Sequence, residues 1–179
     1  MTIEIKISKK PVEYKKAVNY LENRLHKIQQ NKGNELIWIL SHNDIFTAGV
    51  NFLEDEIVDK SIKIIKTNRG GKLTYHGKGQ LIFYFVINLN NRRKDIRRFI
   101  KIIEDSIIES LKQYKITSRR DRKNIGIWVK HKNKTKKVGA IGIKIKKWIA
   151  YHGFSLNINT RLKNFKKIVP CGIRNREVM

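Results

Sequence analysis

Hydrophobic residues change their spacing near the start of the chain. Isoleucine fills every second position from Ile3 to Ile7, an alternation that predicts a half-buried β-strand. After Pro11, which suits the first turn of a helix, apolar residues recur at helical spacing as far as Ile28. The residues NKGN at 31–34 end this pattern. We therefore expect a strand followed by an amphipathic helix.

A second helical stripe runs from Ile96 to Tyr114 and carries Lys and Arg on its opposite face. The other apolar runs are shorter, and we interpret them as strands. They are ELIWILSH at 35–42, LIFYFVINL at 81–89, IGIWV at 125–129, VGAIGIKI at 138–145, WIAYHG at 148–153 and FSLNIN at 154–159. The basic octet KHKNKTKK at 130–137 is expected to form a solvated hairpin loop. This order predicts one α+β domain, residues 1–179, with helices packed on one face of a mixed β-sheet.

Net charge points to anionic partners. The chain has 40 Lys plus Arg against 15 Asp plus Glu, a formal net charge of +25, and such a field attracts polyanions. The cations are nevertheless spread over the whole sequence together with Ile and Asn, as AT-rich coding would produce, and no basic stripe is interleaved with aromatic residues. A non-enzymatic nucleic-acid-binding protein is therefore only an alternative, and no nucleic-acid partner is expected.

Cysteine usage and hydropathy indicate the compartment. Cys171 is the single cysteine, which excludes an internal disulfide and favours a reducing cytosol. The N-terminus has no apolar signal core, and the longest apolar run, residues 81–87, is too short to span a bilayer. We expect a soluble, cytoplasmic protein with no membrane partner.

The stretch RGGKLTYHGKGQ at 69–80 is the candidate ligand loop. Its glycines expose the backbone and permit positive φ, so a ligand can lie against main-chain amides, with Arg69 and His76 at the edges. Bends and bulges at the entry to a strand explain Gly70 and Gly71 equally well. The spacing is not that of a nucleotide phosphate loop, and a strand rather than a helix is expected to follow.

Cys171, in VPCGI, is either an inert buried residue or a nucleophile. An ammonium about 4 Å from the sulfur contributes on the order of 4 kcal/mol at an effective dielectric of 20, enough to lower a thiol pKa by roughly three units. Lys137 is the candidate because it opens a strand with small residues, although an exposed strand-end lysine fits the same pattern. His152 is a possible base. With His76 and Cys171 it lacks any zinc-binding spacing, so no metal is expected.

Five segments follow one another in the order RGGKLTYHGKGQLIFYFVINL, GIWV, KKVGAIGIKI, YHGFSLNIN and VPCGI. Together they resemble the octanoyl-[acyl-carrier-protein]:protein N-octanoyltransferases, and the match runs from about WILSHNDIFTAGVNF to Cys171. The resemblance implies a fold similar to that of biotin and lipoate protein ligases. It also implies that an octanoyl group moves from the phosphopantetheine thiol of acyl carrier protein to a cysteine, and then to a lysine of a lipoyl domain. That transfer is the first step of endogenous protein lipoylation.

By position in these motifs, the resemblance implies that Cys171 carries the acyl group and that Lys137 lowers the pKa of its thiol. It implies substrate contacts at Arg69, Gly70, Gly71, Lys72, Leu73, Thr74, Tyr75, His76, Ala140, Ile141, Gly142, Gly153, Phe154 and Ser155. No cofactor is implied apart from the phosphopantetheine of the donor. The implied partners are acyl carrier protein, the lipoyl domains of 2-oxoacid dehydrogenase complexes and the glycine cleavage H protein, and a monomer is expected.

The chemistry then assigns hypothetical roles. Lys137 gives a proton to the departing pantetheine sulfur and later takes one from the incoming lysine amine, and the Gly172 amide is the candidate donor to the oxyanion. The chain departs from the family at Lys78, where the family motif HGPGQ has proline. It also ends shortly after Cys171, where relatives continue with a helical segment. An ATP-dependent lipoate or biotin ligase of the same fold is the enzymatic alternative, although such ligases need no nucleophilic cysteine.

Overall fold

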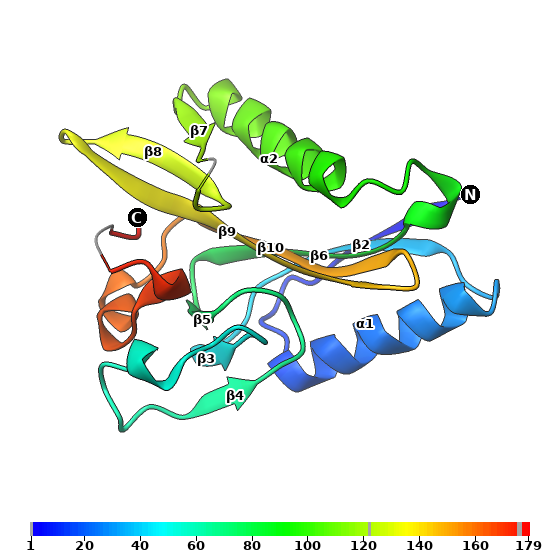
Figure 1. Cartoon of the computed structure of the whole chain (residues 1–179), viewed down its shortest axis with the longest axis horizontal. Coiled ribbons are helices and arrows are strands. Elements are labelled where there is room, and N and C mark those ends of the chain that lie inside the picture. Colours follow the sequence, from blue (N-terminus) through cyan, green and yellow to red (C-terminus); the bar gives the residue numbers. More distant parts are fainter. Residues whose placement is uncertain (1, 122, 175–176) are drawn as a thin grey trace.

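The computed structural model describes residues 2–121, 123–174 and 177–179. Its strands and α-helices are shown in Figure 1. They are β1 (Ile3–Ile7), α1 (Tyr14–Gln29), β2 (Glu35–Leu40), β3 (Ile45–Ala48), β4 (Ile64–Lys66), β5 (Leu73–His76), β6 (Gln80–Asn88), α2 (Ile96–Gln113), β7 (Ser118–Arg120), β8 (Ile127–His131), β9 (Lys134–Lys146) and β10 (Ile149–Asn157). Short 3₁₀ turns are η1 (Glu54–Glu56), η2 (Leu89–Asn91), η3 (Leu162–Lys167) and η4 (Pro170–Gly172).

The strands of the described residues form two sheets. The larger has seven strands in the order β1-β2-β6-β10-β9-β8-β7, and the smaller has three in the order β4-β3-β5. In the larger sheet β1 runs parallel to β2, whereas the other neighbours are antiparallel. The predicted α+β class and mixed sheet are therefore confirmed. No described helix is both long and apolar enough to cross a membrane.

The prediction that the helices share one face of the sheet is wrong. Helix α1 buries its apolar stripe against one side of β2, β6 and β10, and α2 packs on the other side of β6, β8 and β10. Figure 1 shows the two helices on opposite sides of the sheet. The reason lies in β6, where Tyr84 and Val86 face α1 while Phe85 and Ile87 face α2. A strand that is apolar on both faces needs cover on both.

The isoleucines of β1 are more exposed than the alternation predicted. Ile3, Ile5 and Ile7 are 39%, 68% and 67% exposed, so the half-buried strand of the sequence analysis is wrong at these side chains. Strand β1 is an edge strand, and Ile5 is paired with Ile37, whose side chain packs on the α2 side. The apolar cluster that contains the α2 stripe extends as far as Ile37 of β2 but includes no residue of β1.

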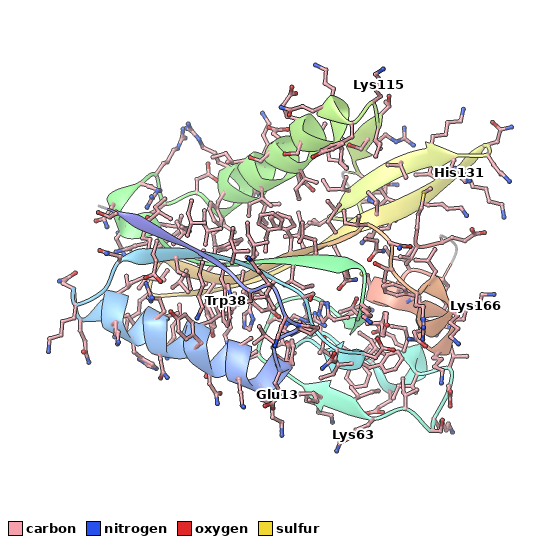
Figure 2. The ribbon with its side chains drawn as sticks, turned by 180° about the vertical axis from the view of Figure 1, so that it is seen from behind. Glu13, Trp38, Lys63, Lys115, His131 and Lys166 are labelled. Carbon is pink, nitrogen blue, oxygen red and sulfur yellow. The ribbon has the colours of Figure 1, made fainter. Side chains whose placement is uncertain are left out.

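Local boundaries differ from expectation where tertiary contacts intervene. Pro11 lies outside α1, because the Val12 amide donates to the Ser41 carbonyl (2.9 Å) before the helix begins. The basic octet forms the predicted hairpin, but its loop is only a two-residue turn at Lys132 and Asn133, both with positive φ. Figure 2 shows His131 towards the far end of this hairpin. The two segments at 148–159 form one strand, β10.

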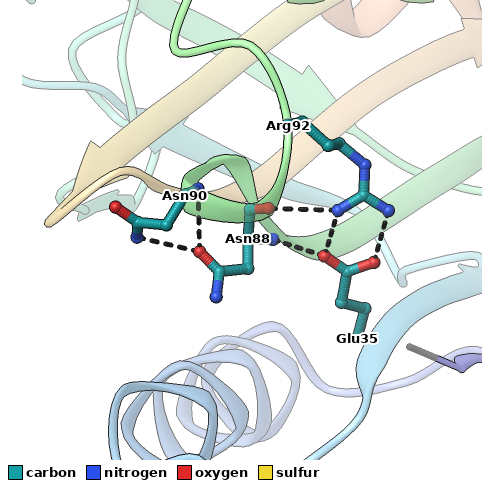
Figure 3. Close-up of polar contacts among 4 residues, drawn as sticks. All are labelled: Glu35, Asn88, Asn90 and Arg92. Atoms are coloured by element: carbon teal, nitrogen blue, oxygen red, sulfur yellow. Dashed lines mark hydrogen bonds and ion pairs between the residues drawn. The ribbon is translucent and has the colours of Figure 1, made fainter.

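A buried ion pair closes the far end of β2 and β6 (Figure 3). Glu35 is 2% exposed and receives two hydrogen bonds from the Arg92 guanidinium, at 2.5 and 2.7 Å. The main-chain amide of Asn88 donates to the same carboxylate (2.7 Å). The side-chain oxygen of Asn88 accepts two hydrogen bonds from Asn90. The pair lets β6 turn into η2 without leaving the carboxylate unpaired.

Candidate active site

A cavity of about 420 Å³ lies where the small sheet, the segment before β5 and the C-terminal part of the chain meet β9 and β10. Figure 1 shows the C-terminal segment beside β9, where the main chains of Lys137 and Val178 form an isolated parallel β-bridge. The size suits a small-molecule pocket. Residues far apart in the sequence therefore share one cleft.

Most of the residues implied by the sequence resemblance line this cavity. They are Arg69, Gly70, Gly71, Lys72, Thr74, His76, Lys137, Ala140, Ile141, Gly142, Gly153, Phe154, Ser155 and Cys171. The side chains of Leu73 and Tyr75 do not, because β5 alternates and turns them into the core beneath the small sheet. The structure thus gathers the implied set, except for these two side chains.

The glycine loop and β9 meet backbone against backbone. The Gly70 amide donates to the Ile143 carbonyl (3.2 Å), and a Cβ on Gly70 would lie 2.5 Å from that oxygen. A Cβ on Gly142 would lie 3.1 Å from the Gly70 carbonyl oxygen. Arg69 holds the loop in place by donating to the Thr47 and Lys72 carbonyls, at 2.7 and 2.9 Å. Close approach, rather than an isolated bend, explains why glycine is needed here.

Lys137 is fixed and buried. Lys137 lies in β9 and is 6% exposed. Its Nζ donates a hydrogen bond to the Ile125 carbonyl (3.1 Å). The ammonium also lies 5.0 Å from the centre of the Trp128 ring. The main chain of Lys137 is held on both sides by the C-terminus, since its amide donates to Glu177 and its carbonyl accepts from Met179. The alternative of an exposed strand-end lysine is therefore wrong.

Cys171 occupies a strained position at the wall of the same cavity. It lies in η4 with φ 56° and ψ 19°, and its side chain is half-buried. A non-glycine residue with positive φ is uncommon and marks a conformation that the surroundings must impose. The Gly172 amide donates to the Val169 carbonyl (3.1 Å), so the hypothesis that this amide binds the oxyanion is not supported.

Two histidines of the cavity wall are uncharged. Burial, with the positive charge of Arg69 acting in the same direction, lowers the pKa of both His76 and His152 to about 3. His76 donates from Nδ1 to the Gln80 side-chain oxygen, and His152 from Nε2 to that of Asn68, each at 2.7 Å. An imidazole with a pKa of about 3 is too weak to hold the Cys171 proton at neutral pH.

No group of three or more His, Cys, Asp or Glu in the described ranges 2–121, 123–174 and 177–179 is arranged to hold a metal ion.

Some residues that line or support the cavity were not predicted from the sequence. Ile125 contributes a main-chain carbonyl, which leaves no trace in the sequence, and Ile100 belongs to the apolar stripe of α2, whose spacing does not show that it faces a cavity. Glu56, a buried acid in η1, gave no signal because its partners follow it much later in the chain.

Comparison with known proteins gives the family of the chain. Residues 13–179 match the family model described as lipoyl protein ligase A/B catalytic domain. The chain belongs to this family. An octanoyltransferase from Wolbachia pipientis wMel is 43% identical over 169 residues, which cover 94% of this chain and 82% of that protein. Another from Ehrlichia chaffeensis is 41% identical over 175 residues, covering 97% and 82%. The resemblance to octanoyltransferases predicted from the motifs is confirmed, and with it the prediction that the chain is a transferase.

Solved structures show the same fold in this lipoyl protein ligase family. A lipoate-protein ligase A bound with ATP superposes with a TM-score of 0.75 at 18% identity, covering 99% of this chain and 76% of that one. A bipartite lipoate protein ligase from Thermoplasma acidophilum, described with its E2 lipoyl domain, gives 0.72 at 17%, covering 94% and 66%. The predicted ligase-like architecture is confirmed. At this identity the likeness concerns the fold and does not choose between ligase and transferase.

Proposed function

We propose that the chain transfers an octanoyl group from acyl carrier protein to a lysine of lipoyl domains through a thioester on Cys171. The observation that carries the proposal is that Cys171 and buried Lys137 line one cavity with the glycine loop. Relatives of about 40% identity that are named octanoyltransferases support the acyl group and the reaction class. Ile100, Ile141 and Phe154 supply an apolar wall for an acyl chain.

The first half-reaction starts from a Cys171 thiolate and a Lys137 ammonium. The sulfur attacks the thioester carbonyl of the donor, and the tetrahedral intermediate then expels the pantetheine sulfur. That sulfur takes the proton from Lys137, which leaves a neutral amine beside the acylated cysteine. The Ile125 carbonyl, 3.1 Å from Nζ, keeps the amine oriented towards the cavity.

The second half-reaction restores the starting charges. The amine of the target lysine attacks the Cys171 thioester and loses a proton to neutral Lys137. Collapse of the intermediate forms the amide and releases the thiolate, so the ion pair is regenerated. The acceptors that we propose are lipoyl domains of 2-oxoacid dehydrogenase complexes and the glycine cleavage H protein. The excess of 25 positive charges favours encounter with acidic protein domains, and we propose action as a cytoplasmic monomer.

Intact mass after incubation with octanoyl carrier protein tests the proposal. We expect an octanoyl adduct without ATP, and its loss in Cys171→Ser. An adduct that requires ATP would favour a ligase, and no adduct under either condition would refute transfer through Cys171.

A second comparison tests the lysine. Lys137→Met is expected to slow transfer by roughly 100-fold or more, as for loss of a general acid and base. Lys136→Met is the matched control, because Lys136 is the preceding residue and pairs with Glu177 (2.7 Å) outside the cavity. Equal rates in both variants would exclude a role for Lys137 in proton transfer.

A further inference from the structure

The turn that carries Cys171 has two consecutive residues in the left-handed region. Cys171 has φ 56° and Gly172 has φ 69°. Glycine adopts such a conformation freely, whereas cysteine does not, so contacts from outside the turn must hold it. The Gly172 and Ile173 amides bond within the turn, to Val169 and Pro170. The outside support has to come from what packs against the turn.

Glu56 of η1 provides that support. Its carbonyl accepts from the Val169 amide (2.7 Å), directly before the turn. Its side chain is 3% exposed, and its Oε1 lies 2.7 Å from the Lys72 Nζ. Its Oε2 accepts from the Leu73 amide at 3.3 Å. One buried residue therefore connects η1 to both the glycine loop and the cysteine segment.

Gly172 packs directly on this ion pair. A Cβ at Gly172 would lie 2.4 Å from Lys72 Cδ, 2.7 Å from its Nζ and 2.8 Å from Glu56 Oε1. The ammonium of Lys72 is therefore next to the residue that follows the cysteine, and Lys72 also lines the cavity. Glu56 holds that ammonium in place and offsets its charge next to the turn that carries the thiol.

We propose that Glu56 is a positioning residue for Cys171: it holds the strained turn against the glycine loop and neutralises the Lys72 charge next to that turn. This inference rests on the proposed acyl transfer. The carboxylate does not touch the reacting atoms. It acts by fixing where the sulfur stands and by leaving Lys137 as the cation that exchanges protons with the substrate.

Glu56→Gln tests the proposal, because the amide keeps the size of the side chain and removes its charge. Two opposite effects are expected. The acyl-transfer rate constant falls about tenfold, with little change in KM for the donor, because the sulfur is less well placed. Alkylation of Cys171 by iodoacetamide at pH 7 rises about three- to tenfold, because Lys72 loses its partner and promotes the thiolate.

Glu54→Gln is the matched control. Glu54 begins the same 3₁₀ turn, but its side chain is 76% exposed and pairs only loosely with Lys66 (3.9 Å). Both rates are expected to stay at the wild-type value. If Glu56→Gln does not fold, Glu56→Asp keeps the charge, shortens its reach by one methylene, and should show the same divergence more weakly.

The two readouts separate the inference from a general structural role. A loss of transfer without faster alkylation would mean that Glu56 merely stabilises the fold, and faster alkylation with normal transfer would mean that it does not position the sulfur. Either result overturns the proposal. If the wild-type protein forms no acyl adduct, the proposed function fails, and an alkylation rate that is unchanged in Glu56→Gln then overturns the positioning role on its own.

Discussion

Acid should destabilise this protein through two buried histidines. Burial, reinforced by the charge of Arg69, lowers the pKa of His76 and His152 from 6.5 to about 3. The unfolded chain therefore binds these two protons more tightly than the folded chain. Their contribution to stability is complete above pH 6.5 and is lost as the pH falls from 6.5 towards 3.

The size of the effect at pH 5 follows from the unfolded pKa. With an unfolded value near 6.5, protonation stabilises the unfolded state at pH 5 by about 2 kcal/mol for each histidine. Any folded pKa below about 4 gives nearly the same result, so the figure does not depend on how far burial lowers it. Two histidines thus remove about 4 kcal/mol between pH 7 and pH 5, a large share of the 5–15 kcal/mol typical of a domain.

Urea unfolding of the wild type and of His152→Asn at pH 7 and pH 5 measures this term. Asparagine tolerates the positive φ of 69° found at residue 152. Between the two pH values the variant should lose about 2 kcal/mol less stability than the wild type, because one buried neutral histidine has been removed. His131→Gln is the control, because His131 is exposed in the β8–β9 hairpin and should behave like the wild type. If His152→Asn loses as much stability as the wild type, His152 is not buried as a neutral ring.

The carboxyl groups with lowered pKa values contribute little to the change in unfolding free energy between pH 7 and pH 5. The pKa of Asp59 is lowered from 3.8 to about 2, mainly by hydrogen bonds from Ser61, and that of Glu177 from 4.5 to about 2, mainly by Lys136. Because these folded values are depressed, the stability that they contribute is present above the unfolded pKa and is lost only at lower pH. The histidine term is therefore the one that changes between pH 7 and pH 5.

Three further outcomes are expected. Glu35→Gln should lower the free energy of unfolding by about 2–3 kcal/mol in urea titrations, because it breaks a buried pair. Glu4→Gln, which breaks a pair with Arg24 whose carboxylate is 43% exposed, should cost less than about 1 kcal/mol, and equal losses would contradict this reasoning. Gly70→Ala should reduce acyl transfer more than tenfold, since its Cβ meets the Ile143 carbonyl 2.5 Å away, and normal kinetics would show that the loop can move aside. Raising salt from about 50 to 500 mM should raise KM for a protein donor but not for a small octanoyl thioester, whereas equal changes would exclude electrostatic docking.

Periodicity predicted the secondary structure well because most elements bury a regular face. Helix α2 was expected at 96–114 and spans Ile96–Gln113, with Ile103, Ile107 and Leu111 in the core. Periodicity could not say which side of the sheet each helix covers. That depends on β6 being apolar on both faces, and an unbroken apolar run does not show how its residues are divided between two helices.

The candidate site divides in the same way. The glycine loop and the Cys171 motif are visible in the sequence because four of the 11 glycines lie within 69–80 and Cys171 is the single cysteine, and the motif order carried the family resemblance. The burial of Lys137 is not visible, since it depends on the Ile125 carbonyl and on pairing with the C-terminal residues. Composition alone does not distinguish one lysine from another, and Lys137 was singled out only by the motif that it opens.

The same selection explains why a charge-rich sequence can still build a specific site. Of the many cations, four line the cavity: Lys123 is exposed at its rim, and Arg69, Lys72 and Lys137 differ in how they are paired. Arg69 donates hydrogen bonds to carbonyl oxygens, and Lys72 forms an ion pair with the Glu56 carboxylate. Lys137 donates to a single carbonyl and lies over the ring of Trp128. Arg69 cannot exchange a proton because a guanidinium stays charged, and the Lys72 proton is held by a carboxylate, whereas Lys137 has no carboxylate partner among the described residues. We therefore expect Lys137 to exchange protons with the substrate in the cavity, although Lys72 packs against Gly172, the residue after Cys171.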